Sequence, residues 1–416
     1  MSKQLFASLL FLVLLASLGC GSARPTKGSL ALACDLDNYV VSDVFDEWHA
    51  VQFRSSASDP DNEMLVQPSI SPPAVLSLST GGQYGAYGAG LLAGWKSVGS
   101  EAKPLLRSDV DVVTAVSTGA LLAPLAFLGE DERNAMIYAN NISDDSFPER
   151  GKLSLIWANS LFDSKNKTEM IEQTITPEIV SRIAAATTRS LFVGIVDLDS
   201  GRFLRINMVE LAKGLSSDPD RQEKCFEAVI DASSAVPVAF SPVFVDGKML
   251  VDGGARRHLF LADPSNMSEQ MADEDTYLVS VLNSNLCTQR TVTKNGVLQI
   301  AQRSAELLVD QSYKDSVRIQ EGAAESSLVD SFSFRHRHYP NASSASKECI
   351  AEGQTCTSEN PAEDRFCQKF MSCLVSKGHR DGRQFAISGQ WPEYADLDLS
   401  SYPCDVNDHT NNYLLN

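Results

Sequence analysis

One serine in this 416-residue chain stands where a nucleophile would be exposed. Residues 110–116 are largely apolar and β-branched, which is typical of a buried strand. Ser117-Thr118-Gly119 interrupts this run, and residues 120–128 are apolar and long enough for a helix. A serine on a sharp strand-to-helix turn has the geometry of a nucleophile elbow. The following helix would also point its positive end at an oxyanion formed nearby.

The usual elbow pattern is Gly-x-Ser-x-Gly, and here it is present in part. Gly119 stands at the last position, whereas Ala115 replaces the first glycine and adds a methyl group to a crowded turn. Serine between small residues is common in ordinary turns, so these residues alone do not favour an elbow over such a turn.

A glycine-rich stretch precedes the serine and could supply backbone donors. Residues 74–79 predict a short buried strand, which continues into Thr80-Gly81-Gly82 and a glycine-dense run to residue 95. Glycines at this density are costly in a helix, but they let backbone approach a ligand or another helix closely. The stretch therefore predicts an oxyanion loop at a helix N-terminus, a closely packed glycine-rich helix, or both.

A carboxylate follows a further predicted strand at residues 249–251. Asp252 is succeeded by Gly253 and Gly254, an arrangement that lets a side chain approach another backbone segment closely. His258, six residues later, offers a Ser-His-Asp triad as a rival mechanism. Its neighbours are charged, and we expect it to be a surface histidine that is dispensable for catalysis.

Taken in order, these segments resemble the patatin-like phospholipase family. Residues 77–90 resemble its oxyanion-hole segment, Ser117 falls on its nucleophile, and Asp252 falls on its catalytic Asp-Gly-Gly/Ala turn. Residues 231–243 resemble its Ala-Ser-x-x-x-Pro…Phe-x-Pro segment, and residues 197–202 resemble the hairpin between these motifs. The resemblance extends over residues 74–258 and weakens towards residue 320.

The resemblance implies an α/β fold with three α/β/α layers around a central, mostly parallel sheet. It also implies acyl transfer by a Ser-Asp dyad, in which Ser117 attacks an ester carbonyl and Asp252 takes its proton directly. The substrates implied are lipid acyl esters, as for a phospholipase A or a lysophospholipase, with no cofactor and no metal. The remaining implied site residues are the oxyanion donors Gly81, Gly82 and Gln83 and the supporting turn residues Gly119, Gly253 and Gly254.

Three positions depart from the family pattern; the change at Thr80 is mild, whereas the missing arginine and Ala115 bear on the rate. Thr80 stands where a third glycine would begin the run, and Gln83-Tyr84 stand where an arginine is often found. Ala115 is the third departure. The alternative function is therefore a catalytically weak or silent envelope protein that uses the same fold for binding.

The charge of the chain limits its partners. The formal net charge is −18. This charge argues against a nucleic-acid partner and against binding to anionic lipid through an overall positive charge. Contact with a membrane would then come through a lipid anchor or through the substrate itself. The content of 43% hydrophobic and 21% charged residues is that of a globular protein, and the oligomeric state stays open.

The N-terminus predicts export. Residues 1–20 have a charged start at Lys3 and an apolar run that is short for a membrane span, as in a cleaved signal peptide. Ser17-Leu18-Gly19-Cys20 resembles a bacterial lipobox, which favours a cell-envelope lipoprotein lipidated at Cys20, in the outer membrane or periplasm. Ordinary cleavage within residues 21–23 and secretion form the alternative.

The remaining cysteines predict disulfides. Apart from Cys20, the nine cysteines leave an even number in an exported chain, without the Cys-x-x-Cys spacing of a zinc site. The predicted organisation is a tether at residues 21–73, an acyl hydrolase domain at 74–325 and a cysteine-rich extension at 326–416. Residues 335–338, Arg-His-Arg-His, predict a solvated patch.

Overall fold

The computed structural model describes residues 32–41, 74–142, 160, 162–261, 276–284, 286, 296–325, 334–356, 366–397 and 399. The predicted signal peptide with Cys20 and most of the predicted tether lie outside this part of the chain. Cys287 and Cys404 lie outside it as well. Among the described helices, none is long and apolar enough to cross a bilayer.

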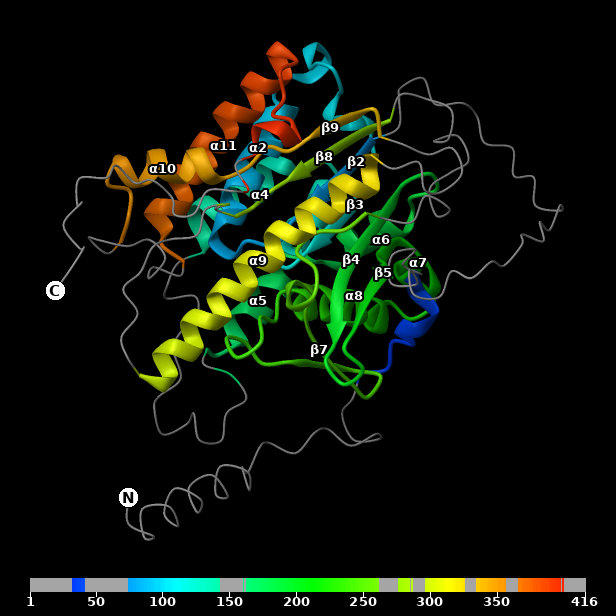
Figure 1. The fold of residues 1–416 in the computed structure, drawn as a ribbon. Coiled ribbons are helices and arrows are strands. Elements are labelled where there is room, and N and C mark those ends of the chain that lie inside the picture. Colours follow the sequence, from blue (N-terminus) through cyan, green and yellow to red (C-terminus); the bar gives the residue numbers. More distant parts are fainter. Residues whose placement is uncertain are drawn as a thin grey trace, which may run out of the picture.

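Parallel strands form the centre of the fold (Figure 1). They are β4 (Ser190–Asp197), β3 (Val110–Val116), β2 (Ala74–Leu78), β8 (Tyr277–Val281) and β9 (His336–His338), in this order across the sheet. Every residue of β2 and β8 is buried, as expected for parallel strands covered on both faces. The strands predicted at residues 74–79 and 110–116 are therefore confirmed.

Antiparallel strands complete the sheet at the β4 side. β5 (Arg202–Asn207) returns from β4 as a hairpin and pairs with β1 (Val40–Val41). β7 (Lys248–Asp252) pairs with the end of β4 and with β6 (Val243–Val245). The predicted class, an α/β fold with a mostly parallel central sheet, is confirmed.

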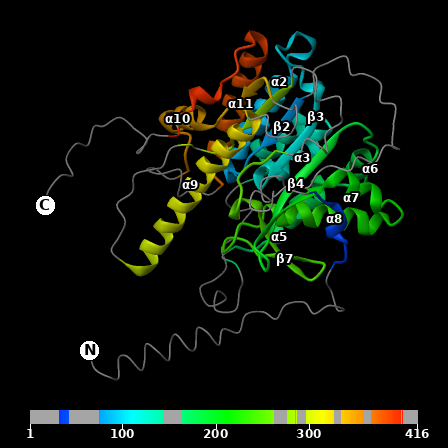
Figure 2. The same cartoon turned by 45° about the vertical axis from the view of Figure 1, so that its right-hand side comes forward.

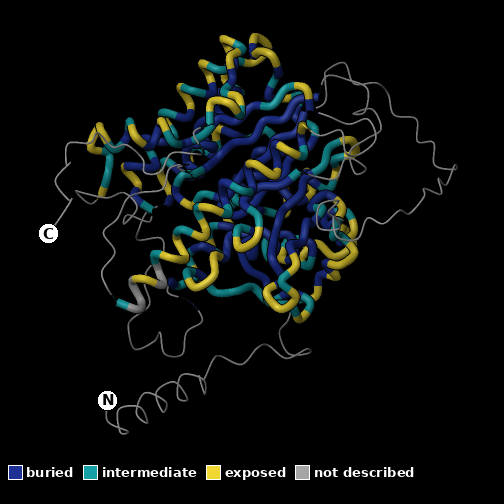
Figure 3. Tube along the Cα trace, in the orientation of Figure 1, coloured by how far each residue is buried: buried dark blue, intermediate teal, exposed yellow. Residues whose placement is uncertain are grey.

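Helices cover both faces of the sheet. Successive side chains of a strand point to opposite faces, and here they pack into two separate apolar clusters. Leu76 packs into the larger cluster, together with residues of α3 (Thr118–Phe127) and of its neighbouring helices. Val75 packs into a second cluster that includes Ala324 of α9 (Val297–Glu325), the long helix crossing the front of Figure 1. Figure 3 shows the buried strands between these layers.

The structure sets the following helix bounds. The larger layer contains α2 (Gly85–Lys96), α3 (Thr118–Phe127), α4 (Asp131–Met136), the π-helix η5 (Ile137–Asn141), α5 (Lys165–Thr174), α6 (Pro177–Ala184), α7 (Met208–Gly214), α8 (Pro219–Ser233), α10 (Ser343–Ala351) and α11 (Gln368–Ser388). α9 spans Val297–Glu325. The short 3₁₀ helices are η1 (Leu36–Tyr39), η2 (Gly82–Tyr84), η3 (Gly99–Glu101), η4 (Arg107–Asp109), η8 (Gly253–Ala255) and η11 (Tyr394–Asp396).

Glycines let α2 and α11 pack backbone to backbone, and the two helices lie side by side in Figures 1 and 2. A Cβ atom on Gly90 of α2 would lie 2.1 Å from the carbonyl oxygen of Val375, and one on Gly378 of α11 would lie 2.2 Å from that of Tyr87. No side chain fits at such distances. The glycine-dense run thus serves close helix packing, and α11, from the predicted C-terminal extension, forms part of the main helical layer together with α2.

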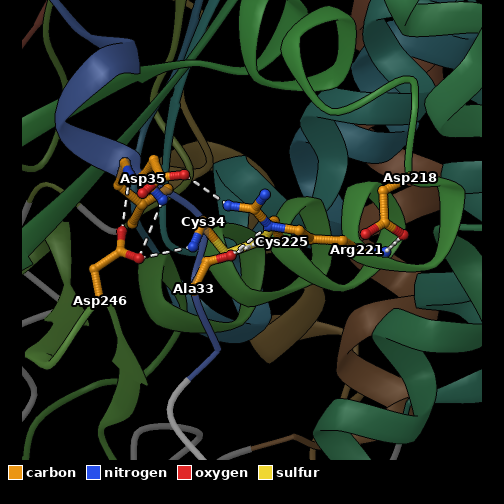
Figure 4. Close-up of a disulfide and its surroundings, with 8 residues drawn as sticks. Ala33, Cys34, Asp35, Asp218, Arg221, Cys225 and Asp246 are labelled. Atoms are coloured by element: carbon orange, nitrogen blue, oxygen red, sulfur yellow. Dashed lines mark hydrogen bonds and ion pairs between the residues drawn. A yellow bond between two sulfur atoms is a disulfide. The ribbon is translucent and has the colours of Figure 1, made fainter. Parts of the chain in front are cut away.

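The first described segment is fastened to α8 (Figure 4). A disulfide joins Cys34 to Cys225, and the carboxylate of Asp246 accepts hydrogen bonds from the backbone N–H groups of residues 34–36. Arg221 adds an ion pair with Asp35 at 2.7 Å. These contacts hold residues 32–41 of the predicted tether against the domain.

Further disulfides lie in the C-terminal part, Cys349–Cys373 and Cys356–Cys367. The prediction of disulfide bonding is therefore confirmed for the cysteines in the described ranges.

Candidate active site

Strand β4 brings the ends of two other strands together. β3 runs along one edge of β4 up to Val116, which pairs with Gly194. β7 then occupies the same edge from the opposite direction, and its last residue, Asp252, pairs with Ile195. The two strand ends therefore meet at neighbouring positions of β4. Ser117, directly after Val116, and Asp252 are placed face to face by this register.

Ser117 and Asp252 are joined by a hydrogen bond. The hydroxyl Oγ of Ser117 donates to Oδ2 of Asp252 at 2.6 Å, and the backbone N–H of Gly254 donates to Oδ1 at 2.7 Å. Ser117 precedes α3 with a φ of 58° and a ψ of −123°, a strained conformation for a residue with a side chain. Ser117 is 6% exposed and Asp252 3% exposed. The predicted nucleophile and the predicted base thus form one buried pair.

The environment of Asp252 tunes the carboxylate towards proton transfer. Burial raises the pKa of Asp252 to about 6, while the hydrogen bonds from Ser117 and from the amide of Gly254 oppose this rise. The positive charge of Lys167 opposes it as well. A carboxylate with a pKa near 6 is ionised at neutral pH and is a stronger base than an exposed one.

The predicted oxyanion segment lies beside the elbow. A Cβ on Gly119 would lie 2.3 Å from the carbonyl oxygen of Leu78, so the start of α3 touches the end of β2. A Cβ on Gly81 would lie 1.2 Å from the carbonyl oxygen of Asn283, which explains the glycine there. Gly82 and Gln83 begin the 3₁₀ helix η2 directly before α2. Backbone N–H groups at such a helix start can stabilise an oxyanion.

One of the comparisons with known proteins identifies a family. Residues 76–263 match the family model described as patatin-like phospholipase. Residues 76–263 are a patatin-like phospholipase domain. No curated protein sequence matches the chain significantly. Among solved structures, the chain is similar to the crystal structure of VipD from Legionella pneumophila, with 12% identity, 76% of this chain and 67% of that chain covered, and a TM-score of 0.34. A similarity at that level supports no argument about function.

The structure corrects the prediction for His258 in the patatin-like domain. His258 is buried, with 4% of its surface exposed, instead of lying at the surface. Its Nδ1 lies 2.6 Å from the hydroxyl of Thr80, and its carbonyl oxygen accepts a hydrogen bond from the Thr80 N–H. The ring packs against Tyr313, and burial lowers the pKa of His258 to about 4. The charged neighbours suggested exposure, but pairing with the end of β2 turns this loop inward.

Ser117 and His258 have different hydrogen-bond partners. Ser117 donates directly to Asp252, while the imidazole of His258 is bonded to Thr80. His258 is nevertheless close by, because a Cβ on Gly254 would lie 3.0 Å from Oδ1 of Asp252 and 3.4 Å from Nδ1 of His258. Ser117 and Asp252 thus form a hydrogen-bonded pair, and the histidine beside them is hydrogen-bonded to Thr80.

Ser233 supports the elbow from behind and was not singled out in the sequence. Its Oγ accepts a hydrogen bond from the backbone N–H of Ser117 at 3.0 Å and donates one to the carbonyl oxygen of Gly194 at 2.7 Å. The next residues hold the base, since the N–H of Asp252 donates to the carbonyl oxygen of Ala235. The serine of the Ala-Ser-x-x-x-Pro pattern was the available signal.

Lys167 of α5 is a second residue that the sequence did not reveal. It is 3% exposed, and its Nζ lies 2.8 Å from Oδ1 of Asp231 and 3.3 Å from Oγ of Ser234. Its ammonium group also lies over the ring of Phe240, 5.0 Å from the centroid. Burial lowers the pKa of Lys167, and the charges of Asp231 and Asp252 oppose this shift.

The predicted solvated patch at residues 335–338 is wrong for most of its members. His336 to His338 form β9 at the sheet edge, where His338 is buried and His336 stacks on Tyr277. Arg337 forms an ion pair with Glu321 at 3.0 Å. Pairing with β8 draws this segment into the fold. Within the described ranges, no group of three or more His, Cys, Asp or Glu side chains could hold a metal ion.

Proposed function

We propose that this protein is a serine acyl hydrolase that cleaves lipid acyl esters, as a phospholipase A or lysophospholipase does. The observation that carries the proposal is the 2.6 Å hydrogen bond from Oγ of Ser117 to the buried carboxylate of Asp252. The patatin-like phospholipase domain supports lipid esters as the substrate class.

The reaction would proceed in two acyl-transfer steps. Asp252 removes the proton as Oγ of Ser117 attacks the carbonyl carbon, and N–H groups of the segment Gly81-Gly82-Gln83 bind the oxyanion. The intermediate collapses to an acyl-serine, and the departing alcohol takes the proton from Asp252. Water then attacks the acyl-serine with Asp252 as base, which releases a fatty acid and restores the serine.

A serine-directed fluorophosphonate probe tests the nucleophile. We expect the folded protein to be labelled at Ser117 and the Ser117→Ala variant to stay unlabelled with an unchanged circular dichroism spectrum. Release of fatty acid from phosphatidylcholine vesicles and from lysophosphatidylcholine then separates the two substrate types. A folded protein that neither reacts with the probe nor releases fatty acid would be a binding protein with a silent site.

We further propose that the protein is an exported lipoprotein of the cell envelope, anchored through Cys20. Disulfides such as Cys34–Cys225 support export, because such bonds persist in oxidising compartments. Metabolic labelling with a fatty acid, compared between the natural chain and Cys20→Ala, tests the anchor. Equal labelling of both chains would reject it, and secretion without lipid would then be the alternative.

A further inference from the structure

The side chain of Gln83, in the predicted oxyanion segment, contacts a part of the chain outside the patatin-like domain. Its amide oxygen Oε1 accepts a hydrogen bond from the backbone N–H of Cys367 at 3.2 Å. Gln83 is 6% exposed, and Cys367 is buried as well. Cys367 lies well beyond residues 76–263, which match the family model. The residue that stands in place of the usual arginine thus links the oxyanion segment to the cysteine-rich extension.

The next residue of η2 contacts the same region. The ring of Tyr84 packs edge-on against that of Phe370 in α11, with 5.6 Å between the ring centroids. Cys367 directly precedes α11, so two consecutive residues of η2 rest on the start of this helix. Donors that stabilise an oxyanion act best when they are already oriented before the charge develops. The start of α11 is therefore placed to keep the segment in its working orientation.

A disulfide joins Cys367 to Cys356, and its two ends differ in exposure. Cys356 is exposed, whereas Cys367 is buried beside Gln83. The other disulfides in the described part of the chain join buried cysteines. Exposed disulfides are the more easily reduced, because a thiolate has to reach one of the sulfur atoms. A thiol reductant in solution should therefore open Cys356–Cys367 before these others.

We propose that Gln83 positions the oxyanion segment and that the Cys356–Cys367 disulfide holds Gln83 through the N–H of Cys367, so that reduction of this disulfide slows ester hydrolysis. The inference rests on the proposed function and adds a positioning residue and a redox dependence to it. In the reduction, a dithiol gives up two electrons and two protons. Its sulfurs join in a new disulfide, while Cys356 and Cys367 become thiols. Gln83 then loses its fixed partner, and the N–H groups of the segment are less well oriented.

Substitutions at both ends of this connection test it. Gln83→Met keeps the length of the side chain, but its sulfur is only a weak hydrogen-bond acceptor. Cys356→Ala/Cys367→Ala removes the disulfide. The matched control is Cys349→Ala/Cys373→Ala, which removes the disulfide between α10 and α11 in the same part of the chain. The measurements are kcat and KM on nitrophenyl butyrate, with circular dichroism to confirm folding.

We expect Gln83→Met to lower kcat by about tenfold with KM nearly unchanged, since loss of a whole oxyanion donor lowers kcat by about 10²–10³-fold. Cys356→Ala/Cys367→Ala should lower kcat by a similar factor, and the control should keep the natural kcat. All three substitutions together should cost no more than either change alone, because both changes act through one contact.

Reduction of the natural protein gives a second measurement. Dithiothreitol is used at a concentration at which alkylation and peptide masses show only Cys356 and Cys367 as thiols. It should lower kcat by the same factor as the Cys356→Ala/Cys367→Ala variant and should leave that variant unaffected. Should the variant fail to fold, the reduced natural protein decides.

Losses that multiply in the combined variant, or an equal loss in the control, would overturn the inference while leaving the hydrolase intact. So would an unchanged kcat after reduction, or reduction of the buried disulfides before Cys356–Cys367. A natural protein that neither cleaves the ester nor reacts with the fluorophosphonate probe would instead reject the proposed function.

Discussion

The hydroxyl of Ser233 holds the backbone of Ser117, accepting its N–H at 3.0 Å while donating to Gly194 at 2.7 Å. Gly194 pairs with Val116, the last residue before the elbow. One buried side chain thus ties the end of α8, the end of β3 and strand β4 together at the point where the serine takes its strained conformation. Ser233 touches no reacting atom, so its role is to position Ser117.

We expect Ser233→Ala to lower kcat by about tenfold or more, with a small effect on KM. An unpaired buried N–H costs about 1–3 kcal/mol, and about 1.4 kcal/mol corresponds to a factor of ten in rate. Ser233→Thr keeps a hydroxyl and should recover part of the rate. Ser376→Ala, on the exposed side of α11, is the control. Equal rates in Ser233→Ala and the control would show that the elbow keeps its geometry without this bond.

Asp252 and His258 should differ sharply when each is replaced. Asp252→Asn keeps the shape but removes the proton acceptor, and loss of a general base typically lowers the rate by about 10²–10⁴-fold. His258→Ala removes the contact with Thr80 and should cost about 1–3 kcal/mol of folding free energy. It should keep far more activity than Asp252→Asn when both are assayed well below their unfolding temperatures. A loss in His258→Ala as large as that in Ser117→Ala would favour a triad.

The pH dependence of kcat/KM should report the ionisation of Asp252. The base must be unprotonated, and burial raises its pKa to about 6, so activity should fall as the pH drops through about 6. The positive charge of Lys167 favours the ionised form of the Asp252 carboxylate. Lys167→Met should therefore move the acid limb of the profile to higher pH, whereas Lys165→Met on the exposed side of α5 should leave it in place. Identical acid limbs in both variants would remove Lys167 from this role.

Asp252 should also lower the stability of the fold at neutral pH. Its pKa is raised from about 3.9 in an unfolded chain to about 6 in the folded protein. The folded state therefore binds the proton more readily, and its stability falls as the pH rises from about 4 to about 6, by about 3 kcal/mol in total. Asp252→Asn carries no such penalty. We expect it to unfold at a higher temperature than the natural protein at pH 7.5, with a difference that shrinks towards pH 4. A lower unfolding temperature for Asp252→Asn at pH 7.5 would contradict this expectation.

The two ends of the candidate site could be predicted from the sequence because each is a local pattern. Ser117 and Asp252 stand between an apolar strand and small residues, and that pattern is readable without knowing the fold. What brings them together is the register of two strands on β4, at Gly194 and Ile195. Strand register depends on pairings far apart in the chain, and no local pattern specifies it.

Residues whose surroundings depend on packing against distant parts of the chain are harder to predict. Lys167 lies in a polar helical segment, and only packing against Asp231 and Phe240 shows that it is enclosed. His258 was expected at the surface because arginines precede it, whereas its contact with Thr80 decides its position. The glycines of α2 indicated a close backbone approach, but they could not reveal that the approaching helix starts at residue 368.

The packing of α2 against α11 also determines when the site can be complete during synthesis. Ribosomes make the N-terminal part of a chain first, and α2 with its preceding oxyanion segment is made long before Gly378 and Gly382. Until that late helix arrives, the glycine face of α2 has no partner. A nascent chain that already contains Ser117 and Asp252 therefore still lacks the support of its oxyanion segment. The oxyanion segment therefore gains the backing of α11 only after residue 382 has been added to the chain.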